Sequence, residues 1–438
     1  MKLNVRKLNL FFLAIATVVP SYWFVSGRQI LNIIYYIGFF LFIVQLFMQK
    51  SDRKISYGIV GIYIISLVWY CLQALIDTGF TTAINSFFAS AMVVIAISYS
   101  LKTEKDFYQL IDLVLICSLP LLILGILEAF SGYNFFQHAD LTLSGSTFYS
   151  EYRLGIFRVS SVFGHPIVYC NYLSIIAALL VYRLSCVFAH RKRILFRIIY
   201  ALVLINVLLT VSRSVILVFI GVQVVLFAVK REKWFTTKKV FVIICITIIL
   251  LISDLIGLGL LNTIEDVFNM LLQVFGLGSD TYSSEFSSIG YSDVTGDRWD
   301  LYRWVYESTS DNLLWGQGTT AQFSYMATEY REKTSIENYY LSMLFQHGFV
   351  GLIIMIVGLL ALLFYIMKRV RFNTLKKICG EQEQKLTFNI TMLCIILGQI
   401  VSYFMANQSG EVRLLYICIG ALIAYNGLLK SRSLSNGC

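Results

Sequence analysis

The chain has 438 residues, of which 58% are hydrophobic and 14% are charged, and its formal net charge is +10. A soluble globular protein has about 45–50% apolar and about 25% charged residues, so this composition excludes that class and indicates a polytopic membrane protein. The nine cysteines fall in predicted membrane spans, one inner loop or the tail, which argues against a disulfide framework. No Cys/His spacing indicates a metal site.

Apolar runs long enough to cross roughly 30 Å of hydrocarbon, about 20 residues each, recur along the chain. The first run follows Lys2, Arg6 and Lys7 as in a signal peptide, but it lacks a small-residue cleavage site, so we interpret it as a retained helix. The sequence predicts an all-α polytopic membrane protein with about 12 transmembrane helices. The predicted spans are 8–25, 30–48, 55–75, 82–99, 109–129, 166–188, 196–212, 213–229, 240–260, 338–367, 386–406 and 412–429.

The seventh and eighth spans form one nearly continuous apolar stretch, which we expect to break near Ser212 and Arg213. With the amino terminus placed in the cytoplasm, most of the 35 basic residues fall in inner segments, as the positive-inside rule requires. Both termini are therefore expected in the cytoplasm. The positive charge is then an orientation signal rather than evidence for nucleic-acid binding. Arg183, near the inner end of its span, is expected to snorkel.

Two outer segments, about 130–165 and 261–337, are too long to be simple turns. The sequence predicts a single integral membrane domain, 1–438, in which the extracytoplasmic loop 261–337 lies between helices 9 and 10 and carries part of the active site. Within that loop, Asp297 to Thr309 would form an amphipathic helix with aromatic side chains suited to the headgroup level. Gly316 and Gly318 indicate a tight turn rather than a phosphate-binding loop, because no nucleotide-binding context follows.

Among the basic residues assigned to the outer side, only Lys333 is a lysine. A guanidinium presents a planar fork that fits phosphate oxygens in pairs, so an arginine-rich outer face indicates an anion such as a lipid diphosphate. Contacts with lipid headgroups and salt bridges are the alternative. The outer arginines are Arg28, Arg153, Arg158, Arg213, Arg298, Arg303, Arg331 and Arg413.

The predicted spans contain few ionisable residues, which argues against an ion-coupled transporter, because such proteins usually need charges near the bilayer midplane. The clearest are Asp112, Glu128, Asp254 and Arg183.

Four separated stretches resemble motifs of the O-antigen ligase and Wzy-type polymerase superfamily. They are "FRVSSVFGHPIVYCNYL" (157–173), "TVSRSVILVF" (210–219), "GDRWDLYRWVYESTSDNLLWGQGTT" (296–320) and "SIENYYLSMLFQHGFVGL" (335–352). The resemblance implies a GT-C-type membrane glycosyltransferase that acts outside the bacterial cytoplasmic (inner) membrane on an oligosaccharide linked to undecaprenyl diphosphate. It implies no metal and no other cofactor. Besides membrane lipids, a flippase and a chain-length regulator are candidate partners, and no nucleic acid is expected.

Carried over from the resemblance, Arg158, Arg213 and Arg298 are candidate diphosphate or sugar-phosphate contacts. Topology alone adds Arg413, on the last outer turn. Glu337 is the candidate catalytic base, at the position where related ligases commonly have a His before Asn. The alternative is that Glu337 and Ser335 only cap the following helix, because an acid favours a helix amino terminus.

Other polar and aromatic residues in these motifs have two interpretations each. Asn338 could hold Glu337 or a sugar hydroxyl. His165, before a Pro at a helix start, is expected to be structural, with substrate contact as the alternative, and His347 is expected to be a packing histidine. Four aromatic residues could stack on sugars or form an interfacial belt: Trp299, Trp304, Tyr339 and Tyr340.

The predicted function is a polysaccharide polymerase, for O-antigen or capsule, that transfers a glycan from undecaprenyl diphosphate to a lipid-linked repeat unit. A ligase that passes the glycan to another acceptor is the alternative enzyme. A lipid-linked oligosaccharide flippase or transporter is the alternative from a different class. The long outer loop and the charge-poor spans favour the enzymes.

Overall fold

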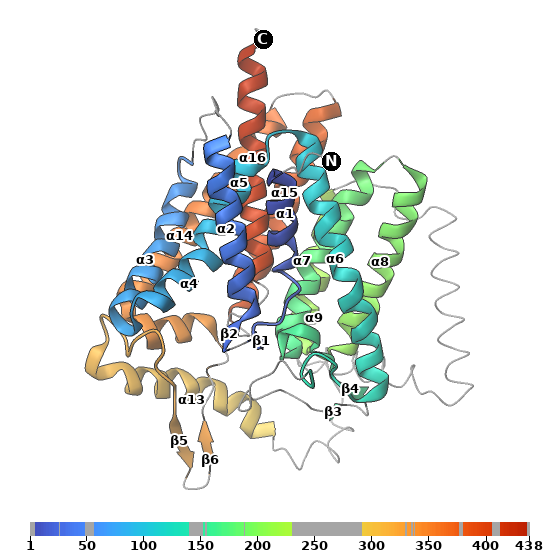
Figure 1. The fold of residues 1–438 in the computed structure, drawn as a ribbon. Coiled ribbons are helices and arrows are strands. Elements are labelled where there is room, and N and C mark those ends of the chain that lie inside the picture. Colours follow the sequence, from blue (N-terminus) through green and yellow to red (C-terminus); the bar gives the residue numbers. More distant parts are fainter. Residues whose placement is uncertain are drawn as a thin grey trace, which may run out of the picture.

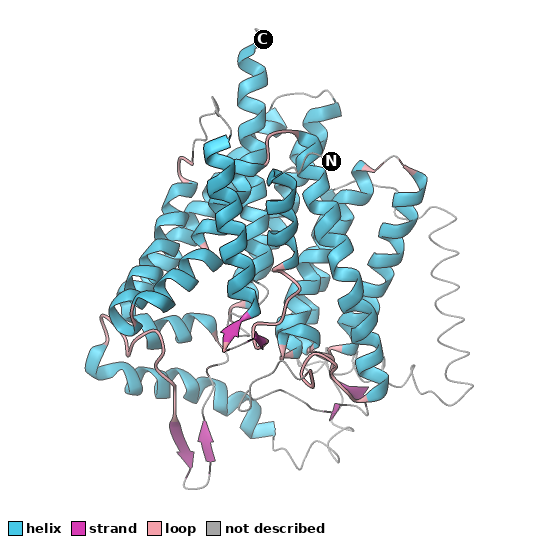
Figure 2. Ribbon diagram, in the orientation of Figure 1, coloured by secondary structure: helices cyan, strands magenta, loops and turns pink. Residues whose placement is uncertain are grey.

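The computed structural model describes residues 5–25, 27–48, 57–139, 152–153, 156–187, 189–229, 291–328, 331–333, 336, 338–375, 380–404 and 412–435. Helices dominate this part of the chain, and the strands form three short antiparallel hairpins (Figures 1 and 2). These are β1 (Phe24–Val25) with β2 (Arg28–Gln29), β3 (Tyr152–Arg153) with β4 (Ile156–Phe157), and β5 (Tyr325–Thr328) with β6 (Arg331–Lys333).

The helices pack side by side, and most of them run along the long axis of the bundle (Figure 1). They are α1 (Val5–Ile15), α2 (Ile30–Met48), α3 (Val60–Thr78), α4 (Phe80–Ala89), α5 (Ala91–Ser100), α6 (Glu104–Ser131), α7 (Pro166–Cys186), α8 (His190–Leu209), α9 (Arg213–Val229), α13 (Tyr291–Thr309), α14 (Tyr339–Leu375), α15 (Gly380–Ser402) and α16 (Val412–Ser435).

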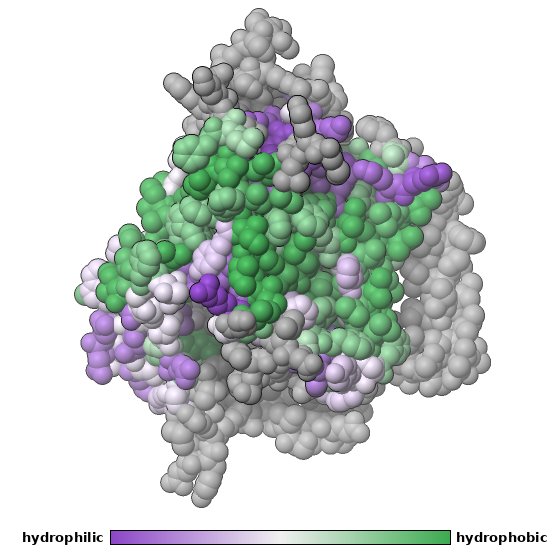
Figure 3. Space-filling view, in the orientation of Figure 1, coloured by the Kyte–Doolittle hydropathy of each residue, from purple (hydrophilic) through white to green (hydrophobic). Residues whose placement is uncertain are grey.

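Seven helical segments of the described residues are long and apolar enough to cross a membrane. Figure 3 shows the corresponding belt of apolar side chains, with polar residues gathered at both ends of the bundle. The chain is therefore a multi-pass, all-α membrane protein. The segments are Ile30–Met48, Val60–Thr78, Phe80–Ser100, Glu104–Ser131, Pro166–Cys186, Tyr339–Arg371 and Gln384–Ser402.

Most of the predicted spans overlap a helix where the structure describes them, and two of them, 8–25 and 82–99, differ from the helices observed. The match is closest at 30–48 and 213–229, which are α2 and α9 to the residue. The predicted break between the seventh and eighth spans is confirmed, because α8 ends at Leu209 and α9 begins at Arg213. The predicted span 240–260 and the first part of the outer loop, residues 261–290, lie outside the described residues, so the total of about 12 spans stays a prediction.

The first predicted span, 8–25, is wrong in its extent, because α1 ends at Ile15 and the chain reaches β1 through a turn. Arg413 explains this end, since its Nη1 donates to the carbonyl of Val19 at 2.7 Å and to that of Ala16 at 3.5 Å. The guanidinium thus satisfies carbonyls that a continued helix would have bonded internally. The predicted span 82–99 is also interrupted, by a non-helical Ser90 between α4 and α5.

Helix α7 lies at the centre of the bundle and is buried around nearly its whole circumference. It packs against α8, α9 and α15, and its amino-terminal end lies at the same end of the bundle as the starts of α9, α14 and α16 (Figure 1). A helix that is apolar on every face is stabilised by such surroundings. This packing fixes the position of the motif that precedes α7.

The expectation that Arg183 snorkels is wrong, because its side chain is buried and paired. Its Nε lies 2.5 Å from Oδ1 of Asp112, and Nζ of Lys192 lies 3.1 Å from Oδ2 of the same carboxylate. The Arg183 guanidinium also stacks over the ring of Tyr108, 4.4 Å from its centroid. This ion network joins α6, α7 and α8.

Candidate functional site

The candidate site is the end of the bundle where α7, α9, α14 and α16 begin, and α13 packs against α14 at the same end (Figure 1). Three of the four sequence motifs that suggested a glycosyltransferase contribute one of these helix starts, and the fourth contributes α13. The topology therefore places all four motifs at one end of the molecule.

Arg158 joins the first two motifs. Its side chain is 3% exposed, its Nε donates to the carbonyl of Thr210 at 3.1 Å, and its Nη2 donates to Oγ of Ser212 at 3.2 Å. The backbone N–H of Val159 also donates to the carbonyl of Leu209. Arg158 therefore holds the turn that immediately precedes Arg213. Its direct contact with a diphosphate stays a prediction.

Arg213 and Arg298 are placed by their helices. Arg213 is the first residue of α9, and Arg298 lies in α13 after the Gly296-Asp297 pair. Their side chains lie outside the described part of the structure, so their predicted contacts with phosphate stay predictions. Arg413 lies at the second position of α16, where the carbonyls of Ala16 and Val19 accept from its Nη1.

His165 is the N-cap of α7, which confirms the structural role expected for it. Its Nδ1 accepts a hydrogen bond from the backbone N–H of Ile167 at 3.2 Å, and Pro166 occupies the first helical position. A Pro there has no N–H to satisfy and a φ suited to a helix. Substrate contact by His165 stays a prediction.

The start of α14 is capped by Asn338, whose Oδ1 accepts from the N–H of Leu341 at 3.1 Å. The Asn338 Nδ2 lies 3.3 Å from the carbonyl of Phe404 and 3.4 Å from the hydroxyl of Tyr302. The amide therefore ties α14 to the end of α15 and to α13, and its predicted contact with a sugar stays a prediction. Glu337 and Ser335 lie outside the described residues.

This cap bears on the two interpretations of Glu337. A helix start needs side-chain or other partners for its first N–H groups, and here Asn338 and the carbonyl of Tyr403, which accepts from Tyr339, supply two of them. Both interpretations of Glu337, as catalytic base and as helix cap, stay predictions.

Helix α14 is interrupted at Gly348, which has φ 64° and ψ −169°. The loop after α13 fills the interruption: Gln317 and Gly318 donate to the carbonyls of Phe345 and Gln346 at 2.8 and 3.0 Å. In return, the N–H groups of the two residues after Gly348 donate to the carbonyls of Leu313 and Leu314. The predicted tight turn at Gly316 and Gly318 is confirmed, because both have positive φ.

Gln73 of α3 locks this junction from the side. Its Nε2 donates to the carbonyl of Trp315 at 3.1 Å, and its Oε1 lies 2.8 Å from Nδ1 of His347. His347 is buried, which confirms the expected packing role. Asp77 extends the contact, because its Oδ2 accepts from the N–H of Thr319. The loop, the broken helix and α3 therefore form one connected unit.

The predicted amphipathic helix at Asp297 to Thr309 is confirmed by α13. For Trp304, neither the stacking on a sugar nor the interfacial belt is correct. Its ring is buried in a small apolar cluster and stacks on the ring of Tyr325, with centroids 5.1 Å apart. The Tyr325 hydroxyl donates to Glu307, and because only the neutral phenol can donate this hydrogen bond, it raises the pKa of Tyr325 above its ordinary value. The cluster comprises Leu301, Trp304, Val305, Phe323, Ile336, Leu341 and Phe345.

Tyr339 and Tyr340 also have protein partners. The Tyr339 ring lies 4.8 Å from the ring of Tyr403, and the Tyr340 hydroxyl donates to the carbonyl of Ile400. These contacts fasten the start of α14 to the end of α15.

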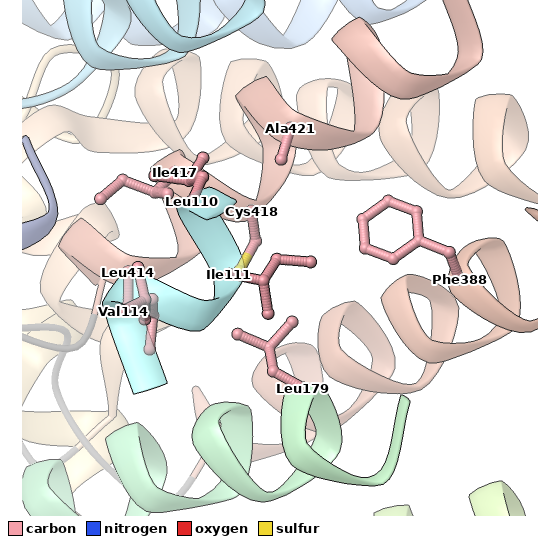
Figure 4. Close-up of a pocket in the computed structure, with 9 residues that line it drawn as sticks. All are labelled: Leu110, Ile111, Val114, Leu179, Phe388, Leu414, Ile417, Cys418 and Ala421. Atoms are coloured by element: carbon pink, nitrogen blue, oxygen red, sulfur yellow. The ribbon is translucent and has the colours of Figure 1, made fainter. Parts of the chain in front are cut away.

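A small cavity elsewhere in the bundle is not part of this site. It lies between α6, α7, α15 and α16, no charged side chain lines it, and the thiol of Cys418 is the one lining side chain that can form even a weak hydrogen bond (Figure 4). Such a lining offers nothing that could hold a diphosphate or a sugar. The lining residues are Leu110, Ile111, Val114, Leu179, Phe388, Leu414, Ile417, Cys418 and Ala421.

Sequence reasoning missed the roles of Glu128 and Gln73. Glu128 stood out only as an ionisable residue near a span end, although it is 1% exposed and bonded to Ser160 and Ser161. Its position near the outer end of a span could have indicated this role, because burying a charged carboxylate there costs free energy unless other groups bond to it. No comparable signal marked Gln73.

The helices form an apolar bundle, and the arginine-bearing motifs gather at one end of it. The protein is therefore of the class of multi-pass membrane proteins with a polar site at one end of their helices. Residues 198–356 match the model of the Wzy_C family, described as O-Antigen ligase, which confirms the resemblance seen in the sequence motifs. This match covers residues 198–356, less than half of the chain. No curated protein matches the chain.

The matched segment covers the second half of α8, all of α9 and α13, and the beginning of α14. It includes Arg213, Arg298 and Glu337, whereas Arg158 and Arg413 lie outside it. The family supports glycan transfer of the ligase or polymerase type. Because Arg158 bonds to the turn before Arg213, the structure connects a motif outside the match to the matched segment.

Proposed function

We propose that the chain is a metal-independent, GT-C-type polysaccharide polymerase. It transfers a growing glycan from undecaprenyl diphosphate to a lipid-linked repeat unit, on the outer face of the cytoplasmic membrane. The observation that carries the proposal is the family match over 198–356, together with the gathering of the four motifs at one end of the bundle.

The reaction follows from the residues assigned to it. The acceptor hydroxyl oxygen forms a bond to the anomeric carbon while the bond from that carbon to the diphosphate oxygen breaks, and the electron pair leaves with the diphosphate. Glu337 takes the proton of the hydroxyl as general base. Arg213 and Arg298 stabilise the negative charge that develops on the leaving diphosphate, which is the electrostatic task that a metal performs in many other transferases.

Three residues with described side chains hold the segments that carry the proposed reacting groups. Arg158 fixes the turn before Arg213, His165 fixes the start of α7, and Asn338 fixes the first turn of α14 directly after Glu337. A reacting group is effective only when it is held in place, because misplacement by about 1 Å can cost a hundredfold in rate. The hydrogen bonds of these three side chains are suited to that task.

The family description favours a second candidate, a ligase that transfers the glycan to an acceptor other than a lipid-linked repeat. Both enzymes form a glycosidic bond and release the same lipid diphosphate. They differ in the acceptor that the site admits. The carboxylate at 337, in place of a His, is the sequence feature on which we prefer the polymerase.

The test uses purified full-length protein with one defined lipid-linked repeat unit, and the products are separated on a gel. A polymerase yields a ladder of glycans that differ by one repeat. Transfer only after a second acceptor is added identifies a ligase. Movement of the lipid-linked substrate across liposomes without a new glycosidic bond would refute both enzymes and favour a flippase.

A further inference from the structure

Glu128, near the end of α6, is buried in a dense set of hydrogen bonds. Its Oε1 accepts from the N–H of Ser160 at 2.9 Å, from the Ser160 hydroxyl at 3.2 Å and from Nδ2 of Asn134 at 2.9 Å. Its Oε2 accepts from the N–H of Ser161 at 2.9 Å. Both oxygens of the carboxylate therefore accept hydrogen bonds, from the loop that contains Ser160 and Ser161 and from Asn134, which follows α6.

The backbone of that loop is shaped around the carboxylate. Ser160 has φ −118° and ψ −18°, and Ser161 has φ 51°, so consecutive residues adopt right-handed and left-handed conformations. Two such residues point their N–H groups into one concavity that attracts an anion. A left-handed conformation costs a residue other than glycine about 1–3 kcal/mol, and it persists only where the surroundings hold it. The Glu128 carboxylate stabilises this conformation by accepting both N–H groups.

The loop lies between two side chains of the candidate site, Arg158 and His165. Arg158, two residues before the concavity, bonds to Thr210 and Ser212 beside Arg213. His165, four residues after it, caps α7. A change in the backbone at 160–161 would shift both side chains relative to the helices that they contact.

We propose that Glu128 is a positioning residue for the transfer reaction. Its carboxylate holds the 160–161 backbone, which sets Arg158 against the turn that precedes Arg213, a predicted contact of the lipid diphosphate. Glu128 acts through Arg158 and does not itself touch the substrate. This inference rests on the proposed function, because it assumes that the site binds a lipid diphosphate.

The test is the binding of undecaprenyl diphosphate to purified full-length protein, measured as both a dissociation constant and a number of sites. Glu128→Gln keeps the shape of the side chain but replaces one acceptor oxygen by an NH₂ group, which cannot accept from a backbone N–H. We expect the dissociation constant to rise by about tenfold to a hundredfold, with the number of sites unchanged. Glu104→Gln, the same change at the other end of α6, is the matched control and should bind as the wild type does.

Two results would overturn the inference. One is a Glu128→Gln variant with the dissociation constant of the wild type. The other is a variant with fewer sites but unchanged affinity, since this pattern means that Glu128 only supports folding. If too little of the Glu128→Gln variant folds for titration, Asn134→Ala removes one donor to the carboxylate and keeps the carboxylate itself, while it also removes the bonds of Asn134 to the 160–161 loop and to its own following turn. We then expect a rise of about threefold, and an unchanged constant would contradict the inference.

The same titration separates this inference from the proposed function. A wild-type protein that binds undecaprenyl diphosphate but forms no glycosidic bond contradicts the proposed function, while the variants still decide the role of Glu128. A wild-type protein that does not bind undecaprenyl diphosphate contradicts both.

Discussion

Replacement of Gly348 by Ala should open the junction between α14 and the loop after α13. A Cβ at this position would lie 2.3 Å from the carbonyl oxygen of Leu314 and 2.5 Å from the backbone nitrogen of Trp315. Both contacts are with backbone, so no flexible side chain can move aside. The observed φ of 64° with ψ of −169° is a region that is essentially restricted to glycine, at a cost of about 1–3 kcal/mol for other residues.

The collision adds to this strain, because relief requires the loop to move. Movement would break the hydrogen bonds from Phe349 to Leu313 at 2.9 Å and from Val350 to Leu314 at 3.2 Å. Each contributes about 0.5–1.5 kcal/mol, so strain and lost bonds together destabilise the junction by about 2–6 kcal/mol. The lower end of this range corresponds to more than a tenfold change in the population of the open junction.

Hydrogen–deuterium exchange of purified protein measures this opening directly. In Gly348→Ala, the amides of 313–318 and of 349–350 should exchange at least about tenfold faster than in the wild type. Gly221→Ala is the control, because Gly221 lies within α9 and a Cβ there meets nothing within 4 Å. It should leave exchange unchanged or stabilise the helix slightly. Wild-type protection at 349–350 in the Gly348 variant would refute this explanation of the interruption.

Further predictions address other parts of the chain. Gln73→Leu leaves the buried His347 and the carbonyl of Trp315 without their partner, and the buried group alone should cost about 1–3 kcal/mol. Thermal unfolding in detergent should therefore begin at a lower temperature than in a control at an exposed position, Ile76→Ala. Asp112→Asn breaks a buried ion pair and should cost about 3–5 kcal/mol by the same assay. Lys192→Ala removes a mostly exposed partner and should cost less than about 1 kcal/mol; equal losses would contradict the burial argument. Glu337→Gln should abolish glycan growth with expression intact, whereas retained activity would identify Glu337 as a helix cap. Wild-type activity should survive treatment with a metal chelator, and its loss would contradict the metal-independent mechanism.

The sequence predicted those elements that depend on local patterns. Apolar runs of membrane-spanning length located α2 and α9 to the residue, and the polar pair at Ser212 and Arg213 located the break before α9. The cap at His165 was predictable because a following Pro suits the first position of a helix. These signals lie within a few residues of the feature that they determine.

Features that depend on distant partners were not predictable in this way. Helix α1 ends at Ile15 although the apolar run continues, and the group that satisfies the chain beyond it is Arg413, at the far end of the sequence. The interruption at Gly348 exists because a separate loop supplies its hydrogen bonds. Glu128 gains its role from residues 32 and 33 positions further along. One sequence does not show which distant segments meet.

The proposed function requires that this chain form glycosidic bonds with a lipid diphosphate as leaving group. A single assay counts undecaprenyl diphosphate released against glycosidic bonds formed, with purified protein and one defined lipid-linked repeat unit in detergent. We expect one diphosphate released for each bond formed, and neither product with Glu337→Gln. Substrate that stays intact with the wild-type protein, with no diphosphate released and no bond formed, would contradict the proposed function.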